Sequence, residues 1–137
     1  MLHLIRKAFT GEYFNNLTLN MANILVIDDD LSVRVIVEQI LKSAGHKVIL
    51  AADGSEGISL CRTEPADLVI TDIFMPGQDG VQTIVQFRNL FPQVPIIAMS
   101  GITEGEMLAV AQKLGAVAIL KKPFDHEQLL IAVEKAL

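Results

Sequence analysis

The sequence predicts an α/β domain with a doubly wound parallel sheet, on the strength of three features. Short apolar runs alternate with segments of helical periodicity, which is typical of repeated strand–helix–strand units. The runs show little alternation of apolar and polar residues, as expected of strands that helices cover on both faces. The 137 residues correspond to about one domain. Right-handed crossovers between the parallel strands follow from this pattern.

Five apolar runs are predicted as strands. They lie at residues 23–27, 47–51, 68–71, 95–99 and 117–120. The third run leads directly into Asp72 and is followed by the turn-forming residues Pro76, Gly77 and Gly80, so this acid should lie where a buried strand meets its loop. Ligands of open parallel sheets bind at the carboxyl ends of the strands, which makes Asp72 a candidate site residue.

A predicted helix follows each strand. The first helix has apolar residues at positions i, i+3 and i+4 and should end at Gly45. The residues that follow this spacing are Val33, Ile36, Val37, Ile40, Leu41 and Ala44. A weaker second helix contains Gly57 and places Ile58 and Cys61 on its apolar side.

Apolar spacing and capping signals predict the last three helices. The third is marked by Val81, Ile84, Val85 and Phe91 and closed by Pro92. Capping boxes, Thr103 with Glu106 and Asp125 with Gln128, begin the fourth and fifth helices, and Gly115 ends the fourth. The inner face of the fifth is expected at Leu129, Ala132, Val133 and Ala136.

Composition argues against several classes of function. Lys and Arg number 11 against 16 Asp and Glu, and this net charge of −5 disfavours nucleic acid or an anionic membrane as a partner. The single cysteine, Cys61, suits a reducing compartment, and no apolar run reaches the ~18 residues of a membrane helix. A cytoplasmic domain is expected over residues 22–137. Residues 1–21 are interpreted as an N-terminal extension, either a partly disordered leader or a short amphipathic helix.

Polar residues follow four of the five predicted strands. Acids at positions 28–30 follow the first strand, Asp72 the third, Ser100 the fourth and Lys122 the fifth. Because parallel strands end on one edge of the sheet, these side chains are expected to converge. Several carboxylates together are costly unless a cation lies among them, and Mg²⁺ prefers carboxylate, water and phosphate oxygens. A carboxylate nucleophile with a metal, a hydroxyl and a lysine is the set of groups that an aspartyl phosphate requires.

Each of these residues also has a purely structural interpretation. Asp28 and Asp30 could solvate a strand end or cap a helix, and Asp72 could be a simple turn residue. Ser100 is ordinary in a turn, and Lys122 could belong to a solvated lysine pair. The coincidence of all of them at one edge of the sheet favours a functional site.

Four segments combine into a specific pattern over residues 22–137. They are Ile24-Leu-Val-Ile-Asp-Asp-Asp30, Asp67-Leu-Val-Ile-Thr-Asp-Ile-Phe-Met-Pro-Gly-Gln-Asp-Gly80, Pro95-Ile-Ile-Ala-Met-Ser-Gly101 and Gly115-Ala-Val-Ala-Ile-Leu-Lys-Lys-Pro-Phe124. This pattern resembles the receiver domain of bacterial two-component response regulators. The resemblance implies a flavodoxin-like (βα)5 fold, with strand order 2-1-3-4-5 and helices on both faces of the sheet.

The resemblance further implies a phosphoryl-accepting signalling switch. Asp72 is then the phosphoacceptor, and Asp29 is the direct ligand of Mg²⁺ or Mn²⁺. Asp28 acts on the metal through water, and the backbone carbonyl of Phe74 completes the protein's share of the coordination. Such a domain is not an enzyme with a separate substrate, since it assists only its own phosphorylation and dephosphorylation.

The remaining family positions include one departure. Ser100 stands where the family has Thr or Ser, Lys122 stands where it has Lys, and the Lys122–Pro123 bond is expected to be cis. Three residues before Lys122 the family usually has Tyr or Phe, and this chain has Ile119. A β-branched side chain is stiff at χ1 and has no hydroxyl. Signalling is therefore expected to change the segment from Ser100 to Thr103 while Ile119 keeps its rotamer.

Partners also follow from the resemblance. A histidine kinase or phosphotransfer protein is the expected phosphoryl donor, docking on the first helix at Ser32, Val33, Val35 and Ile36. The output domain or effector is undefined, and the chain is either a stand-alone receiver or part of a larger regulator. The fourth helix, fifth strand and fifth helix are the expected face for that output or for a homodimer.

Three other interpretations compete with this one. Asp28-Asp-Asp-Leu-Ser32 fits the opening motif of haloacid-dehalogenase-type phosphatases, with Asp28 as nucleophile and Asp30 as acid/base. Against it, the chain is short, no acidic pair follows the fourth strand, and Asp72 would have no role. A second alternative is a receiver-like scaffold that acts without phosphorylation. A nucleotide-binding fold is disfavoured because no Gly-rich loop follows the first strand.

Overall fold

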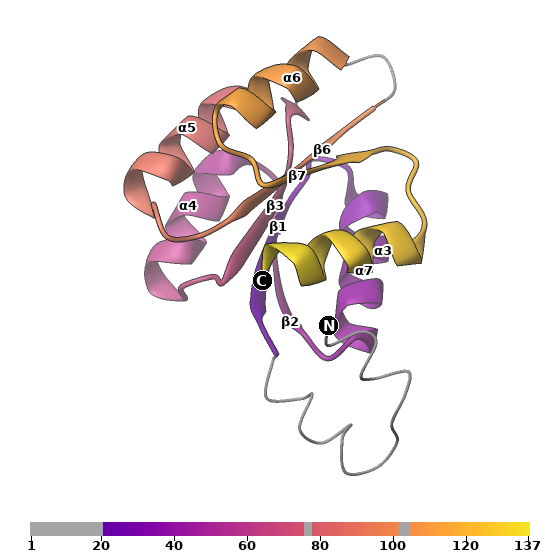
Figure 1. The fold of residues 1–137 in the computed structure, drawn as a ribbon. Helices are drawn as coiled ribbons and strands as arrows, with labels where there is room; N and C mark the ends of the chain where they lie inside the picture. Colours follow the sequence, from indigo (N-terminus) through magenta and orange to yellow (C-terminus); the bar gives the residue numbers. More distant parts are fainter. Residues whose placement is uncertain (1–20, 76–77, 102–104) are drawn as a thin grey trace.

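A computed structural model describes residues 21–75, 78–101 and 105–137 of the chain. The main sheet has five parallel strands. They are β1 (Asn23–Ile27), β2 (Lys47–Ala51), β3 (Leu68–Asp72), β6 (Ile96–Ser100) and β7 (Ala118–Lys121). Their order in the sheet is β2-β1-β3-β6-β7, which is the predicted order 2-1-3-4-5 (Figure 1). The predicted α/β class is therefore confirmed.

Helices cover both faces of this sheet. They are α3 (Leu31–Ser43), α4 (Gly54–Thr63), α5 (Gly80–Leu90), α6 (Gly105–Lys113) and α7 (His126–Ala136). Figure 1 shows α4, α5 and α6 on one face and α3 and α7 on the other. Each helix returns the chain to the edge at which the strands begin, so the five parallel strands all end on the opposite edge.

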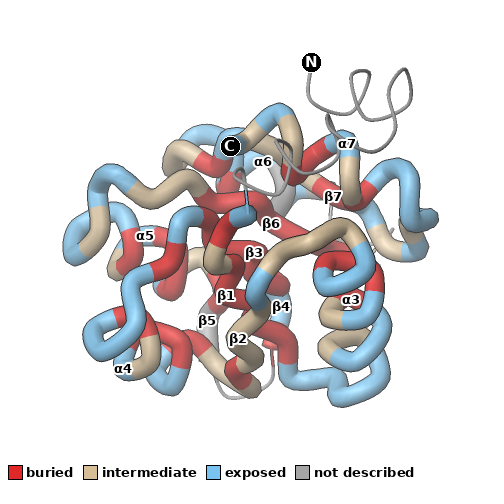
Figure 2. Tube along the Cα trace, turned by 90° about the horizontal axis from the view of Figure 1, so that it is seen from below, coloured by how far each residue is buried: buried red, intermediate tan, exposed pale blue. Residues whose placement is uncertain are grey.

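The core forms two apolar layers, one on each side of the sheet. On one side, side chains from β1, β3 and β6 pack against Ile58 and Cys61 of α4 and Phe87 of α5. On the other side they pack against Leu41 of α3 and Leu129 of α7. β3 and β6 are buried along their whole length, and the buried stretches of the tube gather at the sheet in Figure 2. Burial on both faces explains the continuous apolar runs in the sequence.

Most element boundaries agree with the predicted ones. β1 and β2 match residue for residue, whereas β6 and β7 each lie one residue later than predicted. Gly45 and Gly115 have positive φ just after α3 and α6, as expected of residues that end helices. The capping box of Asp125 and Gln128 is present at the start of α7. The other predicted box depends on Thr103, which lies outside the described residues, as do residues 1–20 of the extension.

Two details of local structure were not predicted. Ile36 and Val85 follow the helical spacing of apolar residues, yet their exposed fractions are 52% and 37%. Helical spacing alone does not tell how far round the helix the core contact extends. An antiparallel pair, β4 (Phe74–Met75) with β5 (Gln78–Asp79), was not predicted, because two-residue strands have no measurable period. Within the described part of the chain, no helix has both the length and the apolar character needed to cross a membrane.

Candidate functional site

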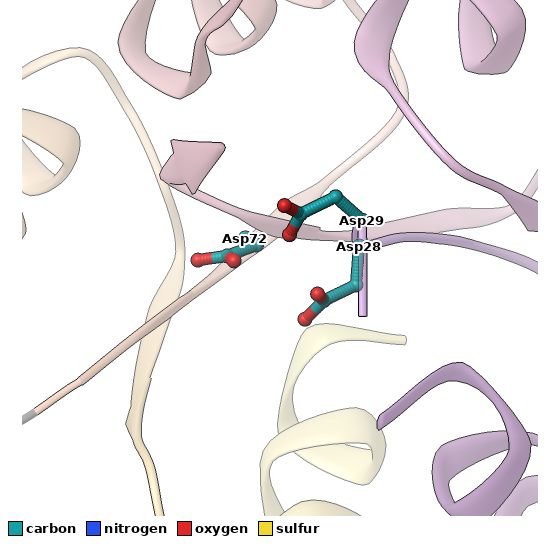
Figure 3. Close-up of side chains that lie close together, drawn as sticks. All are labelled: Asp28, Asp29 and Asp72. Atoms are coloured by element: carbon teal, nitrogen blue, oxygen red, sulfur yellow. The ribbon is translucent and has the colours of Figure 1, made fainter. Parts of the chain in front are cut away.

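Three carboxylates meet at the carboxyl edge of the sheet. Asp28 and Asp29 directly follow β1, and Asp72 is the last residue of β3, the strand next to β1. Each offers one oxygen, and these oxygens lie within 4.8 Å of one another. Figure 3 shows Asp28 and Asp29 extending from the end of β1 toward the side on which Asp72 lies. The convergence predicted from the strand ends is thus present in the structure.

Asp28 is completely buried, and each of its polar atoms has a partner. Its amide donates to the Ala51 carbonyl (3.1 Å), and its carbonyl accepts from Nη1 of Arg34 (2.6 Å). Oδ1 accepts from the Asp30 amide (2.9 Å), and Oδ2 accepts from Nζ of Lys122 (2.7 Å). A buried carboxylate with this many partners is fixed in one orientation. It is well suited to hold a second group in place and poorly suited to attack a substrate.

The carboxylate of Asp72 makes longer hydrogen bonds than that of Asp28, and the exposed fraction of Asp72 is 6%. Oδ1 accepts from the Phe74 amide (3.2 Å), and Oδ2 accepts from Nζ of Lys122 (3.3 Å). Both distances are longer than those at Asp28, so these bonds are weaker. Asp72 therefore keeps more freedom to exchange its present partners for new ones.

The environment of Asp72 raises its pKa from 3.8 to about 6. Burial is the largest cause, because it disfavours the charged form, and the negative charge of Asp28 adds to it. The Phe74 amide and the Lys122 ammonium act in the opposite direction and lower the pKa. A divalent cation beside these acids would favour the charged form further. The site thus holds a carboxylate whose charge is only partly compensated by the protein.

Lys122 bridges the two buried acids from the end of β7. Burial by itself would lower its pKa, but the hydrogen bond and charge of Asp28, together with Asp72, raise it above its usual value. The ammonium is therefore fully charged at neutral pH. The Lys122–Pro123 bond is cis, as predicted, and the Lys122 amide donates to the Ser100 carbonyl (2.6 Å), so the ends of β7 and β6 are tied together.

The other two acids after β1 have separate roles. Asp29 is exposed, and among the described residues no hydrogen bond or ion pair involves its carboxylate, which is therefore available to an ion from solution. Asp30 is the N-cap of α3 and accepts from the Ser32 amide (2.8 Å). The structural interpretation of Asp30 is thus correct. An acid/base role for Asp30 would require it to leave this cap.

Ser100 and Phe74 flank the cluster. Ser100 is buried at the end of β6, one residue beyond the partner of Asp72 in the β3–β6 ladder, and its hydroxyl donates to the Gly101 carbonyl (3.3 Å). Phe74 has 61% of its surface exposed beside the site. The structure thus brings all the predicted site residues to one edge. The roles of Ser100 and of the Phe74 carbonyl remain predictions.

Two residues that support the site were not identified from the sequence. The sequence indicates only a turn at Gly80, yet a Cβ at this position would overlap the backbone of Ile73, between Asp72 and Phe74. Arg34 lies within a helix, and no spacing rule connects it to the acids, although it reaches the Asp28 carbonyl. Only tertiary packing reveals these two contacts.

The donor set fits a hard divalent cation. Three carboxylate oxygens within 4.8 Å of one another, one of them from the exposed Asp29, match the oxygen ligands that Mg²⁺ and Mn²⁺ take, with positions left for water or phosphate. No histidine or cysteine belongs to the cluster, which disfavours zinc. Asp28, Asp29 and Asp72 are therefore the residues that could hold a metal.

Comparison with known proteins identifies the family. Residues 24–134 match the family described as the response regulator receiver domain. The chain belongs to this family. Sporulation initiation phosphotransferase F of Bacillus subtilis is 29% identical to this receiver domain over 114 residues, which are 83% of the chain and 92% of that protein. The transcriptional regulatory protein ZraR of Escherichia coli K12 is 36% identical over 115 residues, or 84% of the chain.

Solved structures agree with this assignment. The receiver domain of NtrX from Brucella abortus superposes with a TM-score of 0.81 at 30% identity and covers 83% of this chain and 97% of that one. The chemotaxis protein CheY4 of Vibrio cholerae gives a TM-score of 0.79 at 32% identity, covering 85% of this chain and 99% of that one. The chain spans only 26% of the length of ZraR.

The two predicted nucleophiles differ in how firmly the protein holds their carboxylates. A haloacid-dehalogenase-type phosphatase would need Asp28 as nucleophile, but here Asp28 is fully buried and its carboxylate accepts from Asp30 and Lys122. Asp72 occupies the less restrained position of the cluster. Receiver domains are phosphoacceptor switches, and the acid cluster of this chain suits that function.

Proposed function

We propose that this receiver domain accepts a phosphoryl group on Asp72 in a reaction that depends on Mg²⁺ or Mn²⁺. The observation that supports this most directly is the cluster of Asp28, Asp29 and Asp72 with Lys122 bound between the two buried acids. Neither a capping role nor a turn explains why four charged groups from three strand ends share one small volume. A phosphoryl-transfer site does explain it.

The proposed donor is the phosphohistidine of a histidine kinase or phosphotransfer protein. One oxygen of the Asp72 carboxylate attacks the phosphorus atom as the bond from phosphorus to the imidazole nitrogen breaks. The electron pair of that bond stays on the nitrogen, which takes up a proton and leaves as neutral imidazole. Asp72 then carries an acyl phosphate, and hydrolysis by water returns the carboxylate and inorganic phosphate. The domain acts on itself and is not proposed to be an enzyme with a separate substrate.

The side chains around Asp72 have distinct tasks in this scheme. Asp29, Asp72 and the Phe74 carbonyl would ligate the cation directly, with Asp28 acting through water. A divalent cation held by these residues would offset the charge of the transferred phosphoryl oxygens. Lys122 is already within 3.3 Å of Asp72 and supplies a second positive charge to the same oxygens. Such preorganised charges cost no rearrangement at the moment of transfer.

Ser100 is proposed to report the phosphoryl group to the surface formed by α6, β7 and α7. Its carbonyl accepts from the Lys122 amide, so a shift of Ser100 is transmitted to the start of α7. A groove of about 810 Å³ lies on this surface, and its lining includes Ile119, Lys121, Phe124 and Lys135. An output partner or a second copy of the chain is the proposed occupant. We expect Ile119 to keep its rotamer during signalling.

Two further proposals concern the chain as a whole. The receiver domain is proposed to span residues 22–137, with residues 1–21 as an N-terminal extension. The family match from 24 to 134 is consistent with this boundary. A cytoplasmic location is proposed as well, on the basis of the single cysteine and the reducing compartment that it suits.

Mass spectrometry after incubation with acetyl phosphate and Mg²⁺ tests the proposal. We expect one phosphoryl group, on Asp72, that is absent after chelation of the metal and absent in Asp72→Asn. Glu64→Gln, which changes an exposed acid away from the cluster, should label like the wild type. Labelling of Asp28 would indicate phosphatase chemistry instead. If Asp72→Asn left the binding and regulation of a partner unchanged, a scaffold that acts without phosphorylation would be the better explanation.

A further inference from the structure

Arg34 reaches the metal-binding end of β1 from the first turn of α3. Its Nη1 donates to the backbone carbonyl of Asp28 at 2.6 Å, a short distance for a charged donor. Long side chains of a helix point toward its N-terminus, and this direction brings the guanidinium from α3 back to the end of the strand. The contact joins two elements that both border the acid cluster.

The position of the cationic Arg34 side chain near the N-terminus of α3 is not explained by the helix itself. Arg34 is the fourth residue of α3, and its amide makes the first bond of the helix, to the Asp30 carbonyl (3.1 Å). Cations near a helix N-terminus are disfavoured by the helix dipole, typically by about 0.3–1 kcal/mol. Arg34 is half-buried rather than extended into solvent. Its position is therefore better explained by the carbonyl that it binds.

The Asp28 carbonyl controls the direction of Asp29. The carbonyl of Asp28 and the amide of Asp29 belong to one planar peptide group, so fixing the carbonyl oxygen fixes the plane from which Asp29 extends. Among the described residues, nothing else holds the Asp29 carboxylate by a hydrogen bond or ion pair. Asp28, in contrast, is held at every polar atom. The exposed ligand of the cluster thus depends on its backbone for orientation.

We propose that Arg34 is a positioning residue for the divalent cation, acting on Asp29 through the Asp28–Asp29 peptide. This inference rests on the proposed function, because it assumes that the acid cluster binds Mg²⁺. Outer contacts that orient metal ligands typically contribute 10–100-fold to metal affinity. The guanidinium would do so without touching the ion.

If Arg34 acts only through its charge, its replacement should change the Mg²⁺ affinity in the opposite direction from the change expected if it positions Asp29. Loss of a cation beside three carboxylates should strengthen the binding of a divalent cation if electrostatics decides. If positioning decides, Arg34→Met should weaken Mg²⁺ binding by about tenfold despite the lost positive charge. Arg34→Lys keeps the charge but cannot present the same fork of donors, so its Mg²⁺ affinity should fall between those of the wild type and Arg34→Met.

Mg²⁺ titration of the full chain, followed by the NMR shifts of backbone amides near the cluster, measures these affinities. Lys42→Met is the matched control, because it removes a cation from the same helix at an exposed pair with Glu38, and its affinity should stay within about twofold of the wild type. Phosphorylation of Arg34→Met by acetyl phosphate should be slow at limiting Mg²⁺ and should recover at saturating Mg²⁺. A merely structural role would lower stability without moving the Mg²⁺ dependence.

The outcomes separate the inference from the proposed function. Unchanged or tighter Mg²⁺ binding in both Arg34 variants would overturn the positioning role while leaving the metal site intact. Absence of Mg²⁺ binding in the wild type would overturn the proposed function itself. If Arg34→Met failed to fold, the Mg²⁺ affinity of Arg34→Lys would test the inference alone. If only the charge of Arg34 mattered, Arg34→Lys would bind Mg²⁺ as tightly as the wild type.

Discussion

Replacement of Asp72 by Asn should stabilise the metal-free protein at neutral pH. The substitution removes a buried charge that the protein compensates only in part, and it keeps the shape and hydrogen-bonding capacity of the side chain. The pKa of Asp72 is raised from 3.8 to about 6 in the folded state. At about 1.4 kcal/mol per pKa unit, this corresponds to roughly 3 kcal/mol of unfavourable free energy when the carboxylate is charged.

The effect should depend on pH with a defined sign. A carboxyl group whose pKa is raised on folding stabilises the folded state fully below its unfolded pKa and loses that contribution as the pH rises through the folded value. The stability of the wild type relative to Asp72→Asn should therefore fall between pH 4 and pH 6 and become constant above about pH 7. Groups that do not interact with Asp72 contribute equally to both proteins and cancel in the difference.

Urea unfolding followed by far-ultraviolet circular dichroism measures this difference. The chain has no Trp and a single Tyr, so backbone ellipticity is a better probe than fluorescence. In EDTA at pH 7.5, we expect the free energy of unfolding of Asp72→Asn to exceed that of the wild type by about 1–3 kcal/mol. The lower value allows for screening of the Asp72 charge by solvent. The exposed control Glu64→Gln should differ from the wild type by less than about 0.5 kcal/mol at every pH.

Added Mg²⁺ should reverse this order. A ligand present at 100 times its dissociation constant stabilises the folded state by about 2.7 kcal/mol, and Asp72→Asn should gain less because it has lost one anionic ligand. If Asp72→Asn proved less stable than the wild type in EDTA at pH 7.5, the burial and charge repulsion assigned to this site would be wrong.

Three further predictions test the supports of the site. Lys122→Met should lower the free energy of unfolding in EDTA at pH 8 by about 3 kcal/mol, because two buried carboxylates lose their cation. Mg²⁺ should restore part of this loss, and an unchanged stability of Lys122→Met in EDTA would contradict the prediction. Gly80→Ala and Gly45→Ala should both destabilise the fold, but only Gly80→Ala should slow phosphorylation by acetyl phosphate, because it displaces the backbone beside the acceptor. Structures with and without a phosphoryl mimic should show one rotamer of Ile119, and a rotated side chain would disprove that expectation.

Local sequence signals were sufficient for the elements of this fold. The apolar runs predicted β1 and β2 to the residue, and the box of Asp125 and Gln128 predicted the start of α7. Signals of this kind act within a few residues of one another, so they are readable from the chain. Spacing alone could not show that Ile36 is exposed, because the width of the contact between a helix and the core depends on the neighbouring elements.

The acid cluster was predictable for a topological reason. Parallel strands end on one edge, so Asp28, Asp72 and Lys122 could be placed together without coordinates, and the structure brings them within hydrogen-bonding distance. Which of these carboxylates the protein pairs with hydrogen-bond donors and cations, and which it leaves exposed, was not predictable. Sequence alone did not indicate that Asp28 is fully satisfied while Asp29 is exposed, since burial depends on which elements pack above the strand ends.

The amino-acid sequence by itself determined the α/β class, the strand ends that bear the acids and the family pattern, because each depends on periodicity and order along the chain. Tertiary structure alone decided the raised pKa of Asp72, the close approach of Gly80 to Ile73 and the contact of Arg34 with Asp28. These three depend on distances between atoms from different elements, and such distances are fixed only when the helices pack on the sheet.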